Sequence, residues 1–343
     1  MESGKLLLRA LAGEVVRPSP IWLMRQAGRY LAEYRALRAE AADFLSFCLT
    51  PALAVEASLQ PVRRFGFDAA ILFSDILLVP WALGHPVSYE EGIGPVLPPL
   101  RDRAGLARLD RARLSEAMEP VRLAIRGVRA ALPAATALIG FAGGPFTLAC
   151  YLVDGRGGEF AASRRMAREE PALFAELIEC LTEAVAMSLV GQAEAGAEAL
   201  MLFDSWAGLL SPALFDRFVI APTSAIVAAV KGRFPALPVI GFPRLAGLMI
   251  EAYGHRAGVD AISLDSSADL ALAARLLGDS IVLQGNLDPF SLLAGGASLR
   301  EEVREIAGAV AGRAHVFNLG HGVLPATRPE HVAELVGIWR GWA

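Results

Sequence analysis

Cysteine is scarce in this chain, with only Cys48, Cys150 and Cys180 among 343 residues. An odd number of widely separated cysteines excludes a disulfide framework and a zinc site built from four cysteines. These are the features of a protein from a reducing compartment, and we therefore expect a cytoplasmic location.

The sequence also lacks charge runs of one sign and long uninterrupted apolar segments. Its net charge is −4, from 32 Lys and Arg against 36 Asp and Glu, and no basic run occurs, so we expect no nucleic-acid partner. The 24 uncharged residues at 130–153 could span a bilayer by length, but two prolines and three glycines interrupt them. We therefore predict a short strand and a glycine-rich turn there, and no membrane span.

What the sequence does have is a large apolar fraction. It is 54% hydrophobic and 20% charged, which excludes a disordered chain and favours a large buried core. Near the N-terminus, Arg9 and Glu14 interrupt the apolar stretch, so we expect a short surface helix rather than a signal peptide. The length allows two domains or one large α/β domain. Because no linker or repeat is visible, we predict a single domain over residues 1–343.

Short apolar runs bounded by turn residues recur eight times, and each is followed by a helical pattern. They lie at 21–24, 69–74, 135–141, 199–203, 238–242, 261–264, 280–284 and 315–319. Their lengths fit buried parallel strands better than helices. Eight alternations of strand and helix predict an α/β fold, a closed (β/α)₈ (TIM) barrel, with an open doubly wound sheet as the alternative.

Local signals predict where some connections begin. Thr-Pro at 50–51 and Ser-Pro at 211–212 are typical of helix starts, and Thr-Arg-Pro-Glu at 327–330 has the spacing of a capping box. The Pro- and Gly-rich insertion from 85 to about 110 predicts a lid or hairpin beside the site.

In a barrel of this kind, chemistry collects where the strands end. Polar residues at the predicted strand ends include cations, a carboxylate, hydroxyls, an amide and a histidine, without a metal-ligand cluster. Arg25 and Arg29 could be an ordinary solvated helical pair. Directly after an apolar strand, with glycine between them, they are better suited to bidentate binding of carboxylates or phosphates.

Asp75 interrupts the apolar run at 71–81, so its charge must be paired, cap the next helix or meet a ligand. Tyr151 could equally belong to the core, Ser205 could cap a helix, and His321 could sit in a turn between two glycines. No dinucleotide, Walker or nucleophile-elbow motif is present in the sequence. The residues alone therefore indicate a barrel enzyme that binds a polyanionic small molecule.

Six motifs resemble those of the uroporphyrinogen decarboxylase family, in order along nearly the whole chain. They are PIWLMRQAGRY (20–30), FSDILLVPWALG (73–84), GFAGGPFTLACYLVDG (140–155), FDSWAGLL (203–210), QGNLDP (284–289) and NLGHGVLPATRPEHV (318–332). The resemblance implies a distorted (β/α)₈ barrel, a homodimer and a carboxy-lyase of haem biosynthesis that needs no cofactor and no metal. Its reaction converts the four acetate arms of uroporphyrinogen III to methyls and gives coproporphyrinogen III.

The resemblance also assigns residues to the site. Substrate contacts fall on Arg25, Gln26, Ala27, Gly28, Arg29, Arg38, Asp75, Tyr151, Ser205 and His321. Asp75 matches the carboxylate that accepts hydrogen bonds from the pyrrole N–H groups and stabilises the cation formed when the pyrrole is protonated. Arg25 and Tyr151 are the other catalytic candidates. Arg25 is the candidate proton donor, although a guanidinium is a poor general acid.

The chain departs from the family pattern at three places. Ala32 stands where the family usually has proline, Gly144 where alanine is commoner, and Ser266 where tryptophan often follows the aspartate. None of these positions is catalytic, so we expect differences in loop shape only.

Two alternative functions make different demands on the residues. A corrinoid-dependent methyltransferase of the same superfamily would need a zinc-binding His-x-Cys pair, and none of the five histidines forms one. A non-catalytic tetrapyrrole-binding protein would not need the combination of Arg25, Arg29, Asp75 and Tyr151. An assay for decarboxylation of the substrate distinguishes both alternatives from a decarboxylase.

Overall fold

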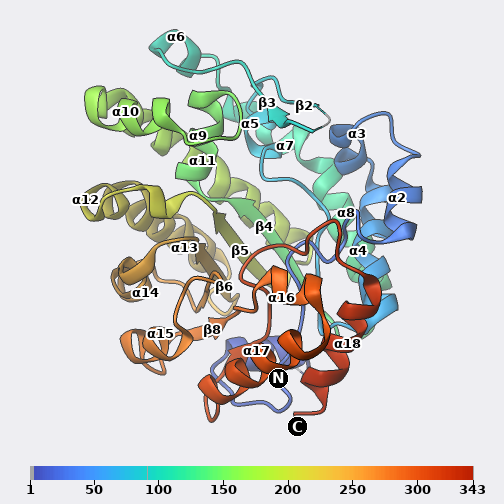
Figure 1. The fold of residues 1–343 in the computed structure, drawn as a ribbon. Helices are drawn as coiled ribbons and strands as arrows, with labels where there is room; N and C mark the ends of the chain where they lie inside the picture. Colours follow the sequence, from blue (N-terminus) through green and yellow to red (C-terminus); the bar gives the residue numbers. More distant parts are fainter. Residues whose placement is uncertain (1–3, 91, 343) are drawn as a thin grey trace.

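The computed structural model describes residues 4–90 and 92–342, and its centre is a seven-stranded sheet (Figure 1). The strands, in hydrogen-bonded order, are β1 (Ala69–Ile71), β4 (Ala137–Gly143), β5 (Ala199–Asp204), β6 (Val239–Pro243), β7 (Ala261–Ser263), β8 (Val282–Gln284) and β9 (His315–Val316). Every neighbouring pair is parallel. Seven of the eight predicted strands are confirmed, with ends within a few residues of those expected.

The remaining predicted strand, at 21–24, is not a strand of this sheet. Ile21 forms one isolated parallel bridge with Phe317. Trp22 N still donates to the Phe317 carbonyl at 3.3 Å, but the pairing ends there. The N–H groups of Leu23 and Met24 donate instead to the side-chain amide oxygens of a glutamine and an asparagine, at 3.1 and 2.9 Å. Side chains thus take the donors that a longer strand would have offered its neighbours.

Helices follow the strands and surround the outside of the sheet (Figure 1). The longer ones are α4 (Pro51–Phe65), α8 (Glu119–Ala131), α9 (Pro145–Asp154), α10 (Ala161–Glu169), α11 (Pro171–Ala195), α13 (Ala221–Arg233), α15 (Leu270–Leu277), α17 (Gly296–Ala309) and α18 (Pro329–Arg340). The shorter ones are α1 (Leu6–Leu11), α2 (Ala32–Arg38), α3 (Phe44–Leu49), α5 (Leu78–Ala82), α6 (Arg103–Leu106), α7 (Leu114–Ala117), α12 (Pro212–Phe215), α14 (Ile250–Arg256) and α16 (Pro289–Ala294).

Alternate residues of the strands pack into two separate hydrophobic cores. Ile139, Met201 and Ile240 belong to a core on the inner face of the sheet. Their chain neighbours Leu138 and Leu200 belong to the larger core between the sheet and the helices. Because side chains alternate between the faces of a strand, one face of the sheet carries its own apolar core and the other packs on the helices, the pattern of a curled sheet.

The predicted N-terminal helix is confirmed as α1, but the expectation that it lies on the surface is wrong. Leu7 and Leu11 are buried in the inner core. Lys5, just before the helix, is 7% exposed, and its Nζ donates to Glu198 Oε2 at 2.6 Å and to the Thr136 carbonyl at 2.8 Å. The helix therefore covers one end of the inner core and is tied there by a buried ammonium group.

The predicted helix starts are confirmed in position but differ in their hydrogen bonds. α4 begins at Pro51, yet the Thr50 hydroxyl donates backwards to the Ser46 carbonyl at 2.7 Å. α12 begins at Pro212 as expected. The capping box at 327–330 is wrong, because α18 begins at Pro329 with the arginine before it at the N-cap, one residue later than the box requires.

The insertion at 85–110 contains the predicted hairpin, formed by β2 (Ser88–Glu90) and β3 (Gly94–Val96) in antiparallel pairing. In Figure 1 the hairpin stands apart from the central sheet. Glu91 in its turn lies outside the described residues. Leu97, directly after the hairpin, donates its N–H to the Gly155 carbonyl at 2.7 Å, which anchors the insertion to the end of α9.

The uncharged stretch at 130–153 contains the end of α8, β4 and most of α9, as its internal glycines and prolines predict. A different stretch, Pro212–Arg233, is long and apolar enough to cross a membrane by length and composition. Half of its apolar window is buried, and its α13 portion packs against α11. A core helix of a folded domain has the same properties.

We predict that Lys5→Met lowers the free energy of unfolding by about 1–3 kcal/mol, because it leaves the Glu198 carboxylate and the Thr136 carbonyl without their buried donor. Arg129, 3.2 Å from Glu198, keeps the loss below that of a fully orphaned charge. Urea unfolding at pH 7 measures the effect.

The control for this prediction is Arg63→Ala, which removes an exposed ion pair with Glu56 on α4. It should change the free energy of unfolding by no more than about 0.5 kcal/mol. Equal effects of the two substitutions would contradict the anchoring role of Lys5.

Candidate active site

The carboxyl ends of the parallel strands meet at one edge of the sheet, and most predicted site residues follow them there. Asp75 lies between β1 and α5, Ser205 directly follows β5, and His321 lies five residues after β9. Arg25 comes four residues after the Ile21 bridge. The topology alone therefore gathers these groups at one end of the molecule.

Asp75 is half-buried, and its carboxylate is held by two donors. Its Oδ1 accepts hydrogen bonds from Leu77 N at 2.8 Å and from the Tyr89 hydroxyl at 2.7 Å. Burial raises the pKa of Asp75, while the two hydrogen bonds and the nearby positive charge of Arg25 act in the opposite direction. Of the three alternatives for this charge, the structure shows neither an ion pair to Asp75 nor a side-chain cap on α5 among the described residues, and its partners are a backbone N–H and a tyrosine hydroxyl.

Residues that follow β9 hold the loop that carries Arg25 in place. Arg25 has a left-handed backbone, with φ of 59°, and its side chain is exposed. Asn318 Oδ1 accepts the N–H of Met24, and Val323 N donates to the Met24 carbonyl, both at 2.9 Å. A Cβ on Gly322 would lie 2.3 Å from Arg25 Cδ, so the absence of a side chain there makes room for the arginine stem.

The other residues of this loop divide into exposed and structural groups. Ala27 and Gly28 are partly exposed and Arg29 is exposed. Gln26 is fully buried: its Oε1 accepts Leu23 N, its Nε2 donates to a β1 carbonyl, and its own carbonyl accepts the Tyr30 hydroxyl. Gln26 therefore supports the loop, and the groups free to meet a ligand are those around it.

Arg38, at the end of α2, contacts the segment that follows it and a ring on α3. Its Nη1 donates to the Ala41 carbonyl at 3.0 Å, and its guanidinium lies 5.8 Å from the ring centroid of Phe47. Its charge lowers the pKa of Cys48, while Asp75 raises it. Cys48 on α3 is therefore close enough to both Arg38 and Asp75 to feel their charges.

A row of packed aromatic side chains lies close to Asp75 and Arg25. The ring of Tyr151 on α9 lies 5.5 Å from Phe160, which lies 4.8 Å from Trp206. The guanidinium of Arg244 lies 6.0 Å from the Trp206 ring. Burial and the charge of Asp75 raise the pKa of Tyr151, so its hydroxyl is protonated and available as a donor at neutral pH.

His321 is uncharged at neutral pH in this setting. Burial and repulsion by Arg25 and Arg244 lower its pKa to about 4, against a smaller opposing effect of Asp265. A neutral imidazole can both donate and accept hydrogen bonds, whereas the two guanidinium groups only donate. The end of the sheet therefore holds two fixed cations around one neutral histidine.

Arg244 and Tyr89 were missed by the sequence prediction. Arg244 follows β6 in the segment GFPR, and its position at a strand end was the available signal. Its N–H donates to the Asp204 carbonyl at 3.1 Å and its carbonyl accepts Gly208 N at 3.0 Å, so its backbone is fixed. Its Nε is buried without a hydrogen-bond partner among the described residues. Nothing in the sequence of the hairpin indicated that Tyr89 would reach Asp75.

Ser205 is half-buried beside a second, hidden carboxyl group. Asp204 is 2% exposed, its Oδ1 accepts the Thr147 hydroxyl at 2.5 Å, and its Oδ2 has no hydrogen-bond partner within the described residues. Burial raises the pKa of Asp204 to about 7, although Thr147 acts to lower it. A Cβ on Gly144 would lie 2.5 Å from Asp204 Oδ2, so the glycine-rich turn packs directly on this carboxyl.

The described residues contain no group of three or more His, Cys, Asp or Glu side chains that could hold a metal ion. The three cysteines lie on α3, α9 and α11, and all are free. A zinc site of the kind that the methyltransferase alternative requires therefore has no ligand set in the described part of the chain.

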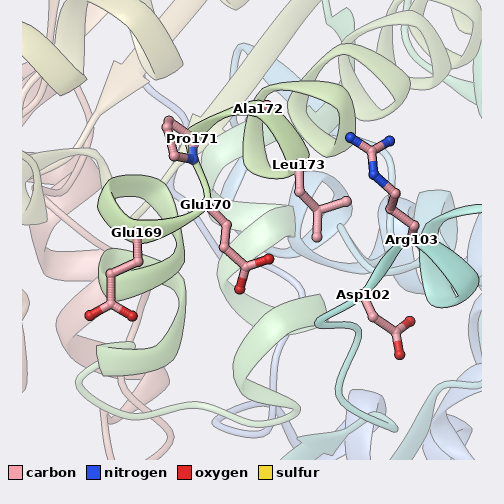
Figure 2. A pocket seen from close by; sticks show the side chains of 7 residues that line it. All are labelled: Asp102, Arg103, Glu169, Glu170, Pro171, Ala172 and Leu173. Carbon is pink, nitrogen blue, oxygen red and sulfur yellow. The ribbon is translucent and has the colours of Figure 1, made fainter.

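A hollow of about 440 Å³ lies elsewhere, between α6 and the junction of α10 with α11 (Figure 2). Asp102, Glu169 and Glu170 line it, and Figure 2 shows their carboxylates pointing in different directions rather than converging. Arg103 at its rim is paired with Glu176 on α11. This hollow lacks the convergent polar groups of the strand ends, so it is not the candidate site.

Comparison with known proteins places this geometry in a family. The sequence profile described as uroporphyrinogen decarboxylase (URO-D) matches residues 2–342. The chain is 54% identical to the uroporphyrinogen decarboxylase of Gluconacetobacter diazotrophicus, covering 98% of both chains. It is 55% identical to that of Acidiphilium cryptum over 97% of this chain and 93% of the other. Among solved structures, a methyltransferase from Methanosarcina mazei shares the fold, with a TM-score of 0.78, 20% identity and 99% coverage of both chains.

We predict that Asp204→Asn changes how stability depends on pH. Asp204 has an ordinary pKa near 3.8 when unfolded and about 7 when folded, so the folded state binds more protons between these values. The wild type should therefore lose stability relative to the variant as pH rises from about 4 to about 7, by up to roughly 3–4 kcal/mol.

Urea unfolding of both proteins across pH 4–8 measures this difference. Comparing the two proteins cancels the opposite pH dependence of His321, which is present in both. A difference that stays constant with pH would mean that Asp204 is ionised throughout, and would contradict the prediction.

Proposed function

The chain belongs to the uroporphyrinogen decarboxylase family, and from this we propose that it decarboxylates the four acetate arms of uroporphyrinogen III to methyls, producing coproporphyrinogen III without a cofactor. The observation that carries the proposal is the 54% identity to a protein of that name over 98% of both chains. The charges at the strand ends independently suit a polyanionic substrate.

Three arginines are proposed to hold the carboxylates of the substrate. Arg25 and Arg29 are exposed on the first loop, and Arg244, with its backbone fixed, lies close enough to His321 to lower its pKa, as Arg25 does. None of the three forms an ion pair with a carboxylate among the described residues, so their donors remain for a ligand. Guanidinium groups bind carboxylates in bidentate fashion and keep their charge at any physiological pH. Ala27, Gly28, Ser205 and His321 would complete the contacts between them.

Asp75 is proposed to stabilise the charge that develops during the reaction. A proton added to the pyrrole α-carbon creates an iminium cation, which accepts the electron pair released when the CH₂–CO₂⁻ bond breaks. Carbon dioxide leaves, the CH₂ carbon takes up a proton to become methyl, and the α-carbon loses its own proton. A fixed carboxylate facing the pyrrole N–H groups stabilises the cation without reorganising.

Arg25 and Tyr151 are proposed as the other catalytic groups. Arg25 is a candidate proton donor, and its guanidinium is intrinsically a weak acid. Asp75 offsets this weakness, because it stabilises the cation that proton transfer to the pyrrole creates. Tyr151, kept protonated by its raised pKa, would donate a hydrogen bond to the acetate and orient it. Arg38, one helix away, would act on the site through its charge.

A closed barrel in a single domain is the proposed fold around this site. The support is that the segment 20–22 bonds to both edge strands. The Ile21 carbonyl accepts Asp68 N at 3.0 Å next to β1, while Phe317 N donates to the Pro20 carbonyl at 2.8 Å next to β9. These bonds suit a short eighth strand position that joins the two edges of the seven-stranded sheet.

The protein is also proposed to be a cytoplasmic homodimer. Leu245 and Leu248 after β6, and Phe290 after β8, are 41%, 70% and 66% exposed at the same end of the sheet as the site. Exposed apolar side chains gathered at one end are typical of a surface that another protein covers. A second copy of the chain is the proposed partner, and the half-buried Pro212–Arg233 stretch fits a protein without a membrane span.

Anaerobic incubation with enzymatically prepared uroporphyrinogen III tests the proposed function. We expect products with seven, six, five and four carboxylates, separated by chromatography, and unchanged activity after dialysis against chelator. Binding without loss of carboxylates would favour the non-catalytic alternative. Activity lost to chelator and restored by Zn²⁺ would overturn the cofactor-free mechanism.

We predict that Asp75→Asn lowers kcat roughly 100-fold or more, because the amide is neutral and offers a donor where the pyrrole N–H groups need an acceptor. The variant should still fold, since Asn has nearly the same size. Anaerobic kinetics and thermal unfolding measure the two properties. Turnover near that of the wild type, with altered stability, would show that Asp75 is only structural.

We predict that Arg244→Gln raises KM about tenfold or more with a smaller change in kcat, because it removes a charge-assisted contact made before the reaction begins. It should also raise the pKa of His321 from about 4, since one of two repelling cations is gone. Steady-state kinetics and NMR titration measure these effects. Arg304→Gln, an exposed substitution on α17, is the control and should change neither.

A further inference from the structure

The hairpin β2–β3 reaches into the site through Tyr89, a residue that no family motif in this sequence includes. Its hydroxyl donates to Asp75 Oδ1 at 2.7 Å across 14 residues of chain. Its ring packs on Phe44, with centroids 4.8 Å apart and an interplanar angle of 63°. The hydroxyl is therefore held in place by aromatic packing on α3 as well as by the hairpin.

The two oxygens of the Asp75 carboxylate have different surroundings. Oδ1 accepts both Leu77 N and the Tyr89 hydroxyl, whereas no described residue donates to Oδ2. A carboxylate with one oxygen bonded from two directions cannot rotate freely about its terminal torsion. The oxygen that remains available is the one that a ligand can use.

We propose that Tyr89 is a positioning residue that fixes the Asp75 carboxylate through Oδ1 and so presents Oδ2 to the pyrrole N–H groups of the substrate. This inference rests on the proposed decarboxylase function and adds a residue to it. The hairpin then carries one of the two donors that orient the reacting carboxylate.

The hydroxyl also favours the ionised form of Asp75. Besides Tyr89, the titratable and charged groups that face Asp75 are Arg25 on the first loop, Tyr151 on α9 and Cys48 on α3. Of these, Arg25 and the Tyr89 hydroxyl favour the charged carboxylate, against the effect of burial. The Tyr89 pKa lies far above its ordinary value, because of burial and the adjacent carboxylate, so the proton stays on the tyrosine.

Tyr89→Phe tests the proposal, because it removes the donor and keeps the ring that packs on Phe44. Without the hydroxyl, the pKa of Asp75 should rise and the carboxylate should lose its orientation. We expect kcat to fall roughly tenfold or more with KM changed little, and the acid limb of the kcat profile to move to higher pH. Anaerobic turnover of uroporphyrinogen III from pH 5 to 9 measures both.

Ser88→Ala is the matched control, since the Ser88 hydroxyl bonds within the hairpin, to the Val96 carbonyl at 3.1 Å, and does not touch Asp75. It should leave kcat and the acid limb unchanged. Wild-type behaviour of Tyr89→Phe, or an equal change in Ser88→Ala, would overturn the positioning role while leaving the proposed function intact. Absence of turnover in the wild-type protein would instead refute the proposed function.

Discussion

The arrangement of the site depends on one unfavourable placement, the carboxylate of Asp75 in a half-buried position at the end of β1. Burial raises its pKa, so the fold must supply interactions that keep it charged. Those interactions come from three separate parts of the chain: the next turn through Leu77 N, the hairpin through Tyr89, and the first loop through the charge of Arg25. Each of these segments is thereby held to the same end of the sheet.

The sequence was sufficient for the features that depend on local pattern. Apolar runs bounded by turn residues located seven strands, because a strand buried on both faces must be apolar along its length. Asp75 stood out because a charge inside an apolar run needs an explanation. The prediction of a strand at 21–24 was wrong, because the backbone N–H groups of Leu23 and Met24 donate to amide side chains. One of these side chains comes from a segment almost 300 residues away. No local pattern contains such a contact.

The residues that were missed are those whose role arises from tertiary placement. Tyr89 is an ordinary strand residue by sequence, and only the folding of the insertion brings its hydroxyl to Asp75. Arg244 is one of many arginines in the sequence. Only the structure shows that its charge, together with that of Arg25, lowers the pKa of His321. Conversely, Gln26 belongs to the most recognisable motif, yet its side chain is fully buried within the loop. A motif identifies a segment, and the structure then decides which of its side chains face the cleft.

Two aspartates at strand ends, Asp75 after β1 and Asp204 at the end of β5, both have pKa values raised by burial, but their surroundings differ. Asp75 has two hydrogen-bond donors and a nearby guanidinium, so its charged form is supported. Asp204 has one hydroxyl donor, an unpartnered Oδ2 and the backbone of Gly144 against it, and its pKa rises to about 7. A second full negative charge would compete with a carboxylate-rich ligand for the arginines. Because Asp204 is buried behind the glycine-rich turn, Asp75 is the more exposed of these two carboxyls at the strand ends.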